Sequence, residues 1–260
     1  SFIPSFPTSP ALPTGDAPNP GAAPVQEQAP VQAIQSPEQP GAEQPEPEEE
    51  PRSVEELLAE LDELTGLDEV KSEIRRQAAI LKVQAKRADA GLKVPTITRH
   101  LVFVGNPGTG KTTVARLVSG IYKALGLLSK GQLVEVDRSE LVAGYLGQTA
   151  TKTSEVAASA IGGVLFIDEA YSLSGDQYGE ESINTLVKEM EDNRDDLVVI
   201  VAGYTGPMRH FVESNPGLKS RFNKYIDFPD YSIEELLTIF EGNCRKYEYV
   251  LADEAKEEVK

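Results

Sequence analysis

The stretch Gly105-Asn-Pro-Gly-Thr-Gly-Lys-Thr112 directly follows the apolar run His100-Leu-Val-Phe-Val104, and a segment with helical periodicity begins directly after it. It matches the pattern G-x-x-x-x-G-K-[ST] in full, in the strand–loop–helix context that this pattern requires. The glycines let consecutive backbone N–H groups turn inward around an anion, and the N-terminus of the following helix adds partial positive charge. The stretch therefore predicts a phosphate-binding loop.

Individual residues of this loop have distinct expected roles toward a nucleoside triphosphate. Lys111 should reach the β- and γ-phosphates, and the hydroxyl of Thr112 should ligate Mg²⁺. The remaining residues expected to contact the nucleotide are Gly105, Asn106, Pro107, Gly108, Thr109, Gly110 and Thr113. A chance match within a glycine-rich turn is the alternative, and the agreement of motif and context argues against it.

A second apolar run, Gly163-Val-Leu-Phe-Ile-Asp-Glu169, ends in two carboxylates. Asp168 is expected to hold Mg²⁺ through water, and Glu169 to polarise the attacking water. Switch-type GTPases need an N-K-x-D motif to read the base, and Asn223-Lys-Tyr-Ile226 lacks its final aspartate. The pair therefore favours ATP hydrolysis over GTP switching and over kinase chemistry. The alternative is that the two acids merely cap a helix beginning at Ala170.

The order of apolar runs and helical patterns predicts the fold class. Apolar runs such as Val198-Val-Ile-Val201 suit central parallel strands that are buried on both faces. Alternation of strands and helices indicates an α/β sandwich around a parallel sheet. Strands are predicted at residues 99–104, 133–136, 163–167, 197–202 and 224–228, and helices at 111–125, 149–160, 180–192 and 208–214.

Two capping boxes, Ser53-Val-Glu-Glu56 and Ser232-Ile-Glu-Glu235, each precede a further helical pattern. Two helices, the second ending near Gly91, are expected before the first strand. We predict an α/β nucleotide-binding core at residues 53–230 and the beginning of a helical lid domain at 231–260. Because the chain opens without Met and stops inside a helical pattern, we interpret it as a fragment.

Residues 1–52 differ in composition from the rest. Of the 18 prolines, 13 lie in the first 51 residues, which contain no Lys or Arg. No apolar periodicity offsets the entropy of ordering this segment, so we predict a disordered linker. A docking peptide for a partner is the alternative.

Charge and composition exclude several classes of protein. The net charge of −17, without a basic cluster, argues against non-specific nucleic-acid binding, although a local basic patch is not excluded. The apolar runs are far too short to span a membrane. A single cysteine, Cys244, fits a reducing compartment, and we expect a cytoplasmic protein. His100 and His210 have no partner at metal-ligand spacing.

Residues 53–250 resemble the AAA+ group that contains red-type Rubisco activase, stage V sporulation protein K and the type VII secretion ATPase. Beside the two motifs above, four stretches carry the resemblance. One is Gly163-Val-Leu-Phe-Ile-Asp-Glu-Ala-Tyr171, which is nearly the family's own form of the acidic strand. Leu64-Thr-Gly-Leu-Asp-Glu-Val-Lys71 resembles the family's adenine-contacting segment, and Gly144-Tyr-Leu-Gly-Gln-Thr149 its pore loop. Asn215-Pro-Gly-Leu-Lys-Ser-Arg-Phe222, followed by Phe228-Pro-Asp-Tyr231, resembles its arginine-finger region.

The resemblance implies roles for these residues. Arg221 corresponds to the arginine that enters the neighbouring subunit's ATP site, which Lys219 could assist; the alternative is a structural ion pair at a strand start. Such an arginine accelerates phosphoryl transfer by roughly 10³–10⁵. Tyr145, with Leu146 and Gly147, corresponds to the loop that grips a protein client in the ring pore; the alternative is a buried core tyrosine.

The sequence departs from the family in two places. Where many members place a water-orienting Asn, this chain has Gly203-Tyr-Thr205, and Tyr204 or Thr205 is the candidate substitute. The lid arginine is missing because the chain ends early, which would weaken nucleotide affinity and hydrolysis if these 260 residues were the whole protein.

Together these features predict a ring-shaped motor that hydrolyses Mg-ATP to remodel a protein client, and the family resemblance implies that the ring is a hexamer. The rival interpretation is an ATP-dependent assembly scaffold, against which the hydrolytic Glu169 argues. A small-molecule P-loop kinase is disfavoured because no substrate-lid pattern is present.

Overall fold

The computed structural model describes residues 52–94, 98–145 and 147–250. Apart from Arg52, the predicted N-terminal linker lies outside the described residues, as do Leu146 of the predicted pore loop and residues 251–260 of the predicted lid segment.

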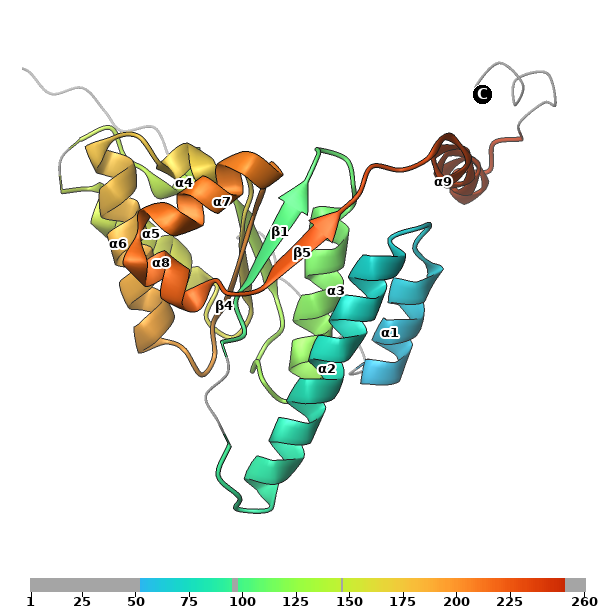
Figure 1. Ribbon diagram of the computed structural model, residues 1–260, viewed down its shortest axis with the longest axis horizontal. Coiled ribbons are helices and arrows are strands. Elements are labelled where there is room, and N and C mark those ends of the chain that lie inside the picture. Colours follow the sequence, from blue (N-terminus) through green and yellow to red (C-terminus); the bar gives the residue numbers. More distant parts are fainter. Residues whose placement is uncertain (1–51, 95–97, 146, 251–260) are drawn as a thin grey trace, which may run out of the picture. The chain divides into compact units, whose positions relative to one another are not determined.

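Within the described residues, five parallel strands form one sheet in the order β2-β3-β4-β1-β5 (Figure 1). The strands are β1 (Leu101–Gly105), β2 (Leu133–Val136), β3 (Val164–Ile167), β4 (Val198–Gly203) and β5 (Tyr225–Phe228). All five coincide with predicted strands to within two residues, and the predicted parallel sheet is confirmed.

Helices precede, separate and follow the strands. They are α1 (Val54–Glu63), α2 (Asp68–Asp89), α3 (Lys111–Ala124), α4 (Arg138–Leu141), α5 (Thr149–Ser159), the 3-10 helix η1 (Ala170–Leu173), α6 (Gln177–Asp192), α7 (Thr205–Ser214), α8 (Pro216–Arg221) and α9 (Ile233–Lys246). No residue of α9 is buried.

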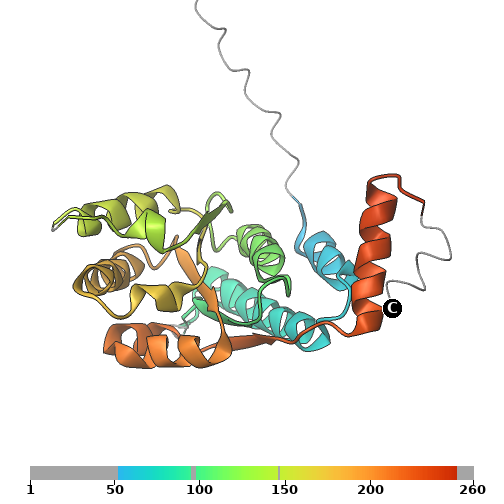
Figure 2. The same ribbon diagram turned by 90° about the horizontal axis from the view of Figure 1, so that it is seen from above.

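Side chains that alternate along the strands supply two separate apolar cores. Helices lie on both sides of the sheet, as the view from above also shows (Figure 2). Phe103 and Phe166 point to one face of the sheet, where they pack with residues of α1, α2 and α3. Val104 and Ile167 point to the opposite face, where they pack with residues of α4, η1, α6, α7 and α8. A sheet buried between two helical layers is the predicted αβα sandwich, which is thereby confirmed.

Several short or early helical segments differ from the sequence-based prediction. Helix α6 begins at Gln177 rather than at residue 180, because Asp176 caps it by accepting hydrogen bonds from the backbone N–H groups of Tyr178 and Gly179. Helix α7 likewise begins three residues before its predicted start. Helices α4 and α8 were not predicted, since each is too short to show apolar periodicity, and η1 was considered only as the alternative helix beginning at Ala170.

Candidate nucleotide-binding site

The loop between β1 and α3 has a backbone that only glycine adopts without strain. Gly108 and Gly110 have φ angles of 77° and 89°, in the left-handed region. A Cβ atom on Gly105 would lie 2.4 Å from the carbonyl oxygen of Phe228 in the neighbouring strand. No side chain caps the N-terminus of α3, so its leading N–H groups are available to an anion.

Lys111, the first residue of α3, is 7% exposed. Its Nζ donates hydrogen bonds to the carbonyl oxygens of Gly105, at 3.1 Å, and Asn106, at 2.7 Å. Burial lowers the pKa of Lys111, and the negative charges of Asp168 and Glu169 oppose that shift. The loop lysine and the two carboxylates predicted at the end of β3 are therefore close enough for their charges to interact.

The hydroxyl of Thr112 donates a hydrogen bond of 3.3 Å to Oε1 of Glu135, on β2. Sequence reasoning missed Glu135. The signal was present, because strand alternation in Leu133-Val-Glu-Val136 turns this acid toward the sheet face that α3 covers. An exposed carboxylate thus lies beside the hydroxyl that was predicted to ligate Mg²⁺.

The two acids after β3 have different local structures. Oδ1 of Asp168 accepts a hydrogen bond of 2.9 Å from the backbone N–H of Glu169. Glu169 has φ 46° and ψ 40°, a left-handed conformation that costs a non-glycine residue about 1–2 kcal/mol. The alternative interpretation was that the two acids cap a helix beginning at Ala170. A short helix, η1, does begin there, but the side chain of Glu169 makes no capping hydrogen bond to it.

Two tyrosines lie close to these acids. Burial raises the pKa of Tyr171, and the nearby charge of Glu169 raises it further. The ring of Tyr204, one of the two residues considered for orienting water, lies 6.1 Å from that of Tyr171 between centroids. Thr205 is the first residue of α7. The carboxyl ends of β3 and β4 thus place a phenol near the predicted catalytic acid.

The segment after β5 contacts the loop from the other side. Nδ2 of Asn106 donates to both carboxylate oxygens of Asp230, at 2.8 and 2.9 Å. The hydroxyl of Tyr231 donates a hydrogen bond of 3.3 Å to the carbonyl oxygen of Thr109. The motif Phe228-Pro-Asp-Tyr231 was assigned only to the arginine-finger region, so these contacts with the loop were missed.

Tyr145 is 73% exposed, so the alternative of a buried core tyrosine is wrong. The loop base is fixed, because Oγ1 of Thr149 accepts a hydrogen bond of 3.1 Å from the backbone N–H of Ala143. Gly147 has a φ of 79°. An aromatic side chain is therefore presented to solvent on an anchored loop.

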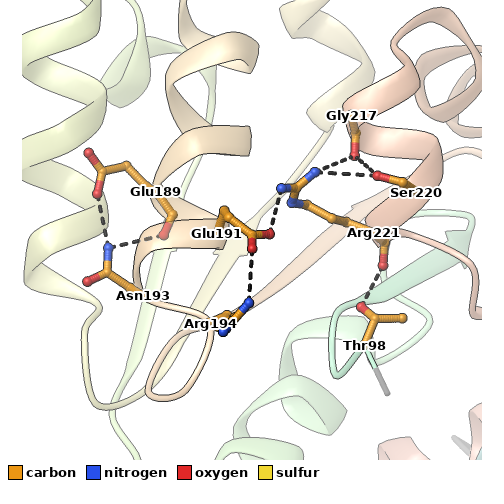
Figure 3. Close-up of polar contacts among 8 residues, drawn as sticks. All are labelled: Thr98, Glu189, Glu191, Asn193, Arg194, Gly217, Ser220 and Arg221. Atoms are coloured by element: carbon orange, nitrogen blue, oxygen red, sulfur yellow. Dashed lines mark hydrogen bonds and ion pairs between the residues drawn. The ribbon is translucent and has the colours of Figure 1, made fainter. Parts of the chain in front are cut away.

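Arg221, the last residue of α8, lies at the opposite edge of the sheet from the phosphate loop. The hydroxyl of Thr98, before β1, donates a hydrogen bond of 2.7 Å to the carbonyl oxygen of Arg221, whereas the loop follows the far end of β1. The intervening strand measures roughly 15 Å. An ion pair of the kind that the alternative interpretation required is present, with Glu191 at 2.8 Å, although at a helix end rather than a strand start (Figure 3).

His100 is a core residue in this structure. Its Nδ1 accepts a hydrogen bond of 3.0 Å from the backbone N–H of Val199. Burial, with smaller contributions from the charges of Arg221 and Arg99, lowers its pKa to about 4. It is therefore neutral at physiological pH.

Among the helices in the described part of the chain, none combines the length and the apolar character that crossing a membrane requires.

The parallel sheet, the glycine-rich loop between β1 and α3, and the acids after β3 define an α/β protein of the P-loop NTPase class. The model of the ATPase family associated with various cellular activities (AAA) matches residues 101–230. The chain belongs to this family.

Named relatives agree with this assignment. Stage V sporulation protein K of Bacillus subtilis (strain 168) is 47% identical over 204 residues, which cover 77% of this chain and 63% of that protein. The chloroplastic ribulose bisphosphate carboxylase/oxygenase activase of Cyanidioschyzon merolae (strain NIES-3377 / 10D) is 47% identical over 205 residues, with coverages of 77% and 70%. The predicted resemblance to this group is confirmed. The chain spans less than two thirds of the length of the Bacillus protein.

A solved structure of the FIGL-1 AAA domain in complex with ADP has the same fold. Its TM-score is 0.52 at 20% identity, and the match covers 71% of this chain and 60% of that chain.

Proposed function

We propose that this protein binds and hydrolyses Mg-ATP in a ring whose neighbouring subunits share each ATP site, and that it uses the cycle to remodel a protein client. One observation carries the proposal. The phosphate loop with Lys111 lies at the carboxyl edge of the sheet, and Arg221 lies at the amino edge. A subunit cannot bring its own Arg221 to its own loop, so in this proposal the arginine serves the ATP site of a neighbour.

In the first half of the site, residues 105–113 hold the triphosphate. The uncapped N-terminus of α3 supplies N–H donors, and the glycine at position 105 leaves no side chain between the loop and β5. Lys111 leaves its loop carbonyls to contact the β- and γ-phosphates. The hydroxyl of Thr112 and the carboxylate of Asp168 are hard oxygen ligands of the kind Mg²⁺ takes, so the residues present fit this ion.

Glu169 then serves as the general base that orients the attacking water. Its backbone is left-handed, and its side chain makes no capping hydrogen bond to η1. Strain of this kind is found at catalytic positions, where the surrounding fold compensates for it. This feature favours hydrolysis over the ATP-dependent scaffold, which has no use for a strained acid beside the phosphate loop.

The second half of the site comes from Arg221 of the neighbour, whose guanidinium stabilises charge on the transferring γ-phosphoryl. A head-to-tail contact of this kind generates a ring when the rotation from each subunit to the next adds up to a full turn. Six subunits are inferred from the family resemblance. Residues 53–230 form the ATPase core, and residues 231–260 begin the lid.

Tyr145, with Leu146 and Gly147, forms the client-gripping loop in this proposal. Its exposed aromatic side chain offers a large apolar contact, and the fixed base at Thr149 transmits the movement of α5 to it. The acidic chain with one cysteine suits a cytoplasmic protein with a protein client rather than a nucleic-acid partner.

Subunit mixing tests the proposal. Lys111→Ala subunits should not bind ATP, and Arg221→Ala subunits should bind it without hydrolysing it rapidly. A mixture should regain part of the ATPase activity, because Lys111→Ala subunits supply Arg221 to intact loops. Arg221→Lys subunits, which keep the charge but lose the planar fork, are the matched control. If mixtures never exceed the sum of the separate variants, the shared site is wrong.

A further inference from the structure

The side chain of Arg221 is held by contacts from two helices (Figure 3). Its Nη2 donates a hydrogen bond of 2.8 Å to Oε2 of Glu191, near the end of α6. Its Nη1 lies 3.3 Å from the carbonyl oxygen of Gly217 and 3.4 Å from the hydroxyl of Ser220, both in α8. The strongest of these contacts is the charge-assisted one to Glu191.

The backbone of Arg221 is fixed independently of its side chain. The hydroxyl of Thr98 donates to its carbonyl oxygen at 2.7 Å, and the following residue, Phe222, is 1% exposed in the core. A long side chain on a fixed backbone still samples several rotamers unless a partner selects one. Glu191 selects one here.

Glu191 is itself held by a second arginine. Its Oε1 accepts a hydrogen bond of 3.1 Å from Nη1 of Arg194, three residues along the chain. The carboxylate therefore bridges two guanidinium groups, and the three side chains together carry one net positive charge. That remaining charge matters, since an uncompensated carboxylate next to Arg221 would repel a phosphate.

The guanidinium of Arg221 retains donors for an acceptor from outside the subunit. Arginine has five N–H donors. Within the described part of the chain, its contacts use Nη1 and one hydrogen of Nη2, leaving Nε–H and the second Nη2 hydrogen. The side chain is 21% exposed, and it lines a cavity of about 680 Å³ together with Arg194 and Arg99.

We propose that Glu191 is a positioning residue for Arg221: it fixes the guanidinium in one rotamer with its free donors directed toward the ATP of the neighbouring subunit. The inference rests on the proposed shared site. Immobilising one long side chain in advance removes an entropic cost that corresponds to roughly 3–10-fold in rate.

The test compares Glu191 variants of the full chain at concentrations where it assembles. Glu191→Ala should lower kcat about 3–10-fold, while affinity for a fluorescent ATP analogue stays unchanged, because the loop and Lys111 are intact. Glu191→Gln keeps one acceptor oxygen and should recover part of the loss. The matched control is Asp192→Asn, which removes the same charge from the next position of α6 and is not among the contacts of Arg221.

A double-mutant cycle separates positioning from a general effect on folding. In an Arg221→Ala background, Glu191→Ala should lower kcat no further, because Glu191 acts only through the arginine. The thermal midpoint should barely change, since exposed ion pairs contribute little to stability. An unchanged or raised kcat of Glu191→Ala, or a full additional loss in the Arg221→Ala background, would overturn the inference.

The same measurements distinguish this inference from the proposed function. If Arg221→Ala alone keeps full turnover, the shared site fails and the positioning role fails with it. If Arg221→Ala is slow and Glu191→Ala is as fast as the Asp192→Asn control, only the positioning role is overturned.

Discussion

Residue scale

Glu169 is a non-glycine residue with left-handed backbone angles at the carboxyl end of β3, next to the acid predicted to hold Mg²⁺ through water. A substitution of Glu169 should therefore affect ATP hydrolysis without affecting ATP binding, whereas a substitution of Lys111 should affect both. Lys111 faces the loop, where binding is decided, whereas Glu169 is proposed to act only when water attacks.

Glu169→Gln should therefore bind ATP with nearly unchanged affinity and turn over about 10²–10⁴-fold more slowly, because an amide cannot accept the proton of the attacking water. Equilibrium binding of a labelled ATP analogue and steady-state phosphate release measure the two effects. Lys111→Ala is the comparison, since it should lose binding itself. Near-normal phosphate release by Glu169→Gln would remove this carboxylate from the mechanism.

His100 predicts a pH dependence of stability. Its pKa is about 4 in the folded protein, compared with 6.5 for an unperturbed histidine, so between these values the unfolded chain binds more protons. The contribution to stability is present above pH 6.5 and is lost as the pH falls toward 4. Between pH 7 and pH 5 the loss amounts to about 2 kcal/mol.

Denaturant unfolding at pH 7 and pH 5 tests this expectation. His100→Gln should lower stability at pH 7 and should show a smaller loss between the two pH values than the parent chain. His210→Gln removes the only other histidine, an exposed one, and should keep the full pH dependence. Equal pH dependence in all three proteins would contradict the assignment to His100.

Element scale

Helix α8 carries Arg221, and its start depends on one side chain. Oδ1 of Asn215 accepts hydrogen bonds from the backbone N–H groups of Gly217, at 2.8 Å, and Leu218, at 3.3 Å. Pro216 occupies the first helical position, which needs no N–H donor. These contacts cap a six-residue helix in which Leu218 is the buried residue.

Asn215→Ala should destabilise the protein by about 1 kcal/mol, because two helical N–H groups lose their acceptor. Asn215→Asp keeps an acceptor at the same position and should remain within a few tenths of a kcal/mol of the parent chain. Urea unfolding measures the difference. Equal stability of the alanine and aspartate variants would show that the cap contributes nothing.

The central strands β1, β3 and β4 were predictable to within two residues because each is a continuous apolar run that is almost entirely buried. The edge strands β2 and β5 each have one exposed acid among apolar residues. Helix α8 was not predictable, since its apolar periodicity covers a single buried residue, Leu218. The predicted start of α6 was late because the cap at Asp176 was overlooked.

The residues of the candidate site likewise fall into those that the sequence could predict and those that it could not. Local motifs predicted the roles of Lys111, Asp168 and Glu169, because each of these residues belongs to a short contiguous motif. Glu135 and Glu191 contact residues 23 and 30 positions away, and Asp230 contacts the loop across 124 positions. No local pattern encodes such proximity, because it arises only when distant segments pack together in the fold.

Whole-molecule scale

If neighbouring subunits share each ATP site as proposed, hydrolysis depends on assembly, while nucleotide binding depends mainly on one chain. The specific ATPase activity should therefore fall steeply on dilution below the assembly range, whereas affinity for a labelled ATP analogue should change little. Phosphate release measured across a dilution series, with the mass distribution recorded at each concentration, checks this. Constant specific activity in a population of single chains would contradict the shared site.

Strand β1 connects the two proposed half-sites within one chain, because Thr98 before it holds the carbonyl of Arg221 and Gly105 at its end opens the phosphate loop. The length of β1 therefore fixes the distance between the phosphate loop that binds a subunit's own nucleotide and the Arg221 that is proposed to enter the neighbour's site. In a closed ring, that spacing constrains the angle through which each subunit turns relative to the last. Lengthening β1 by two residues would preserve its inward–outward alternation and yet alter the curvature of the ring, and with it the number of subunits that close the circle.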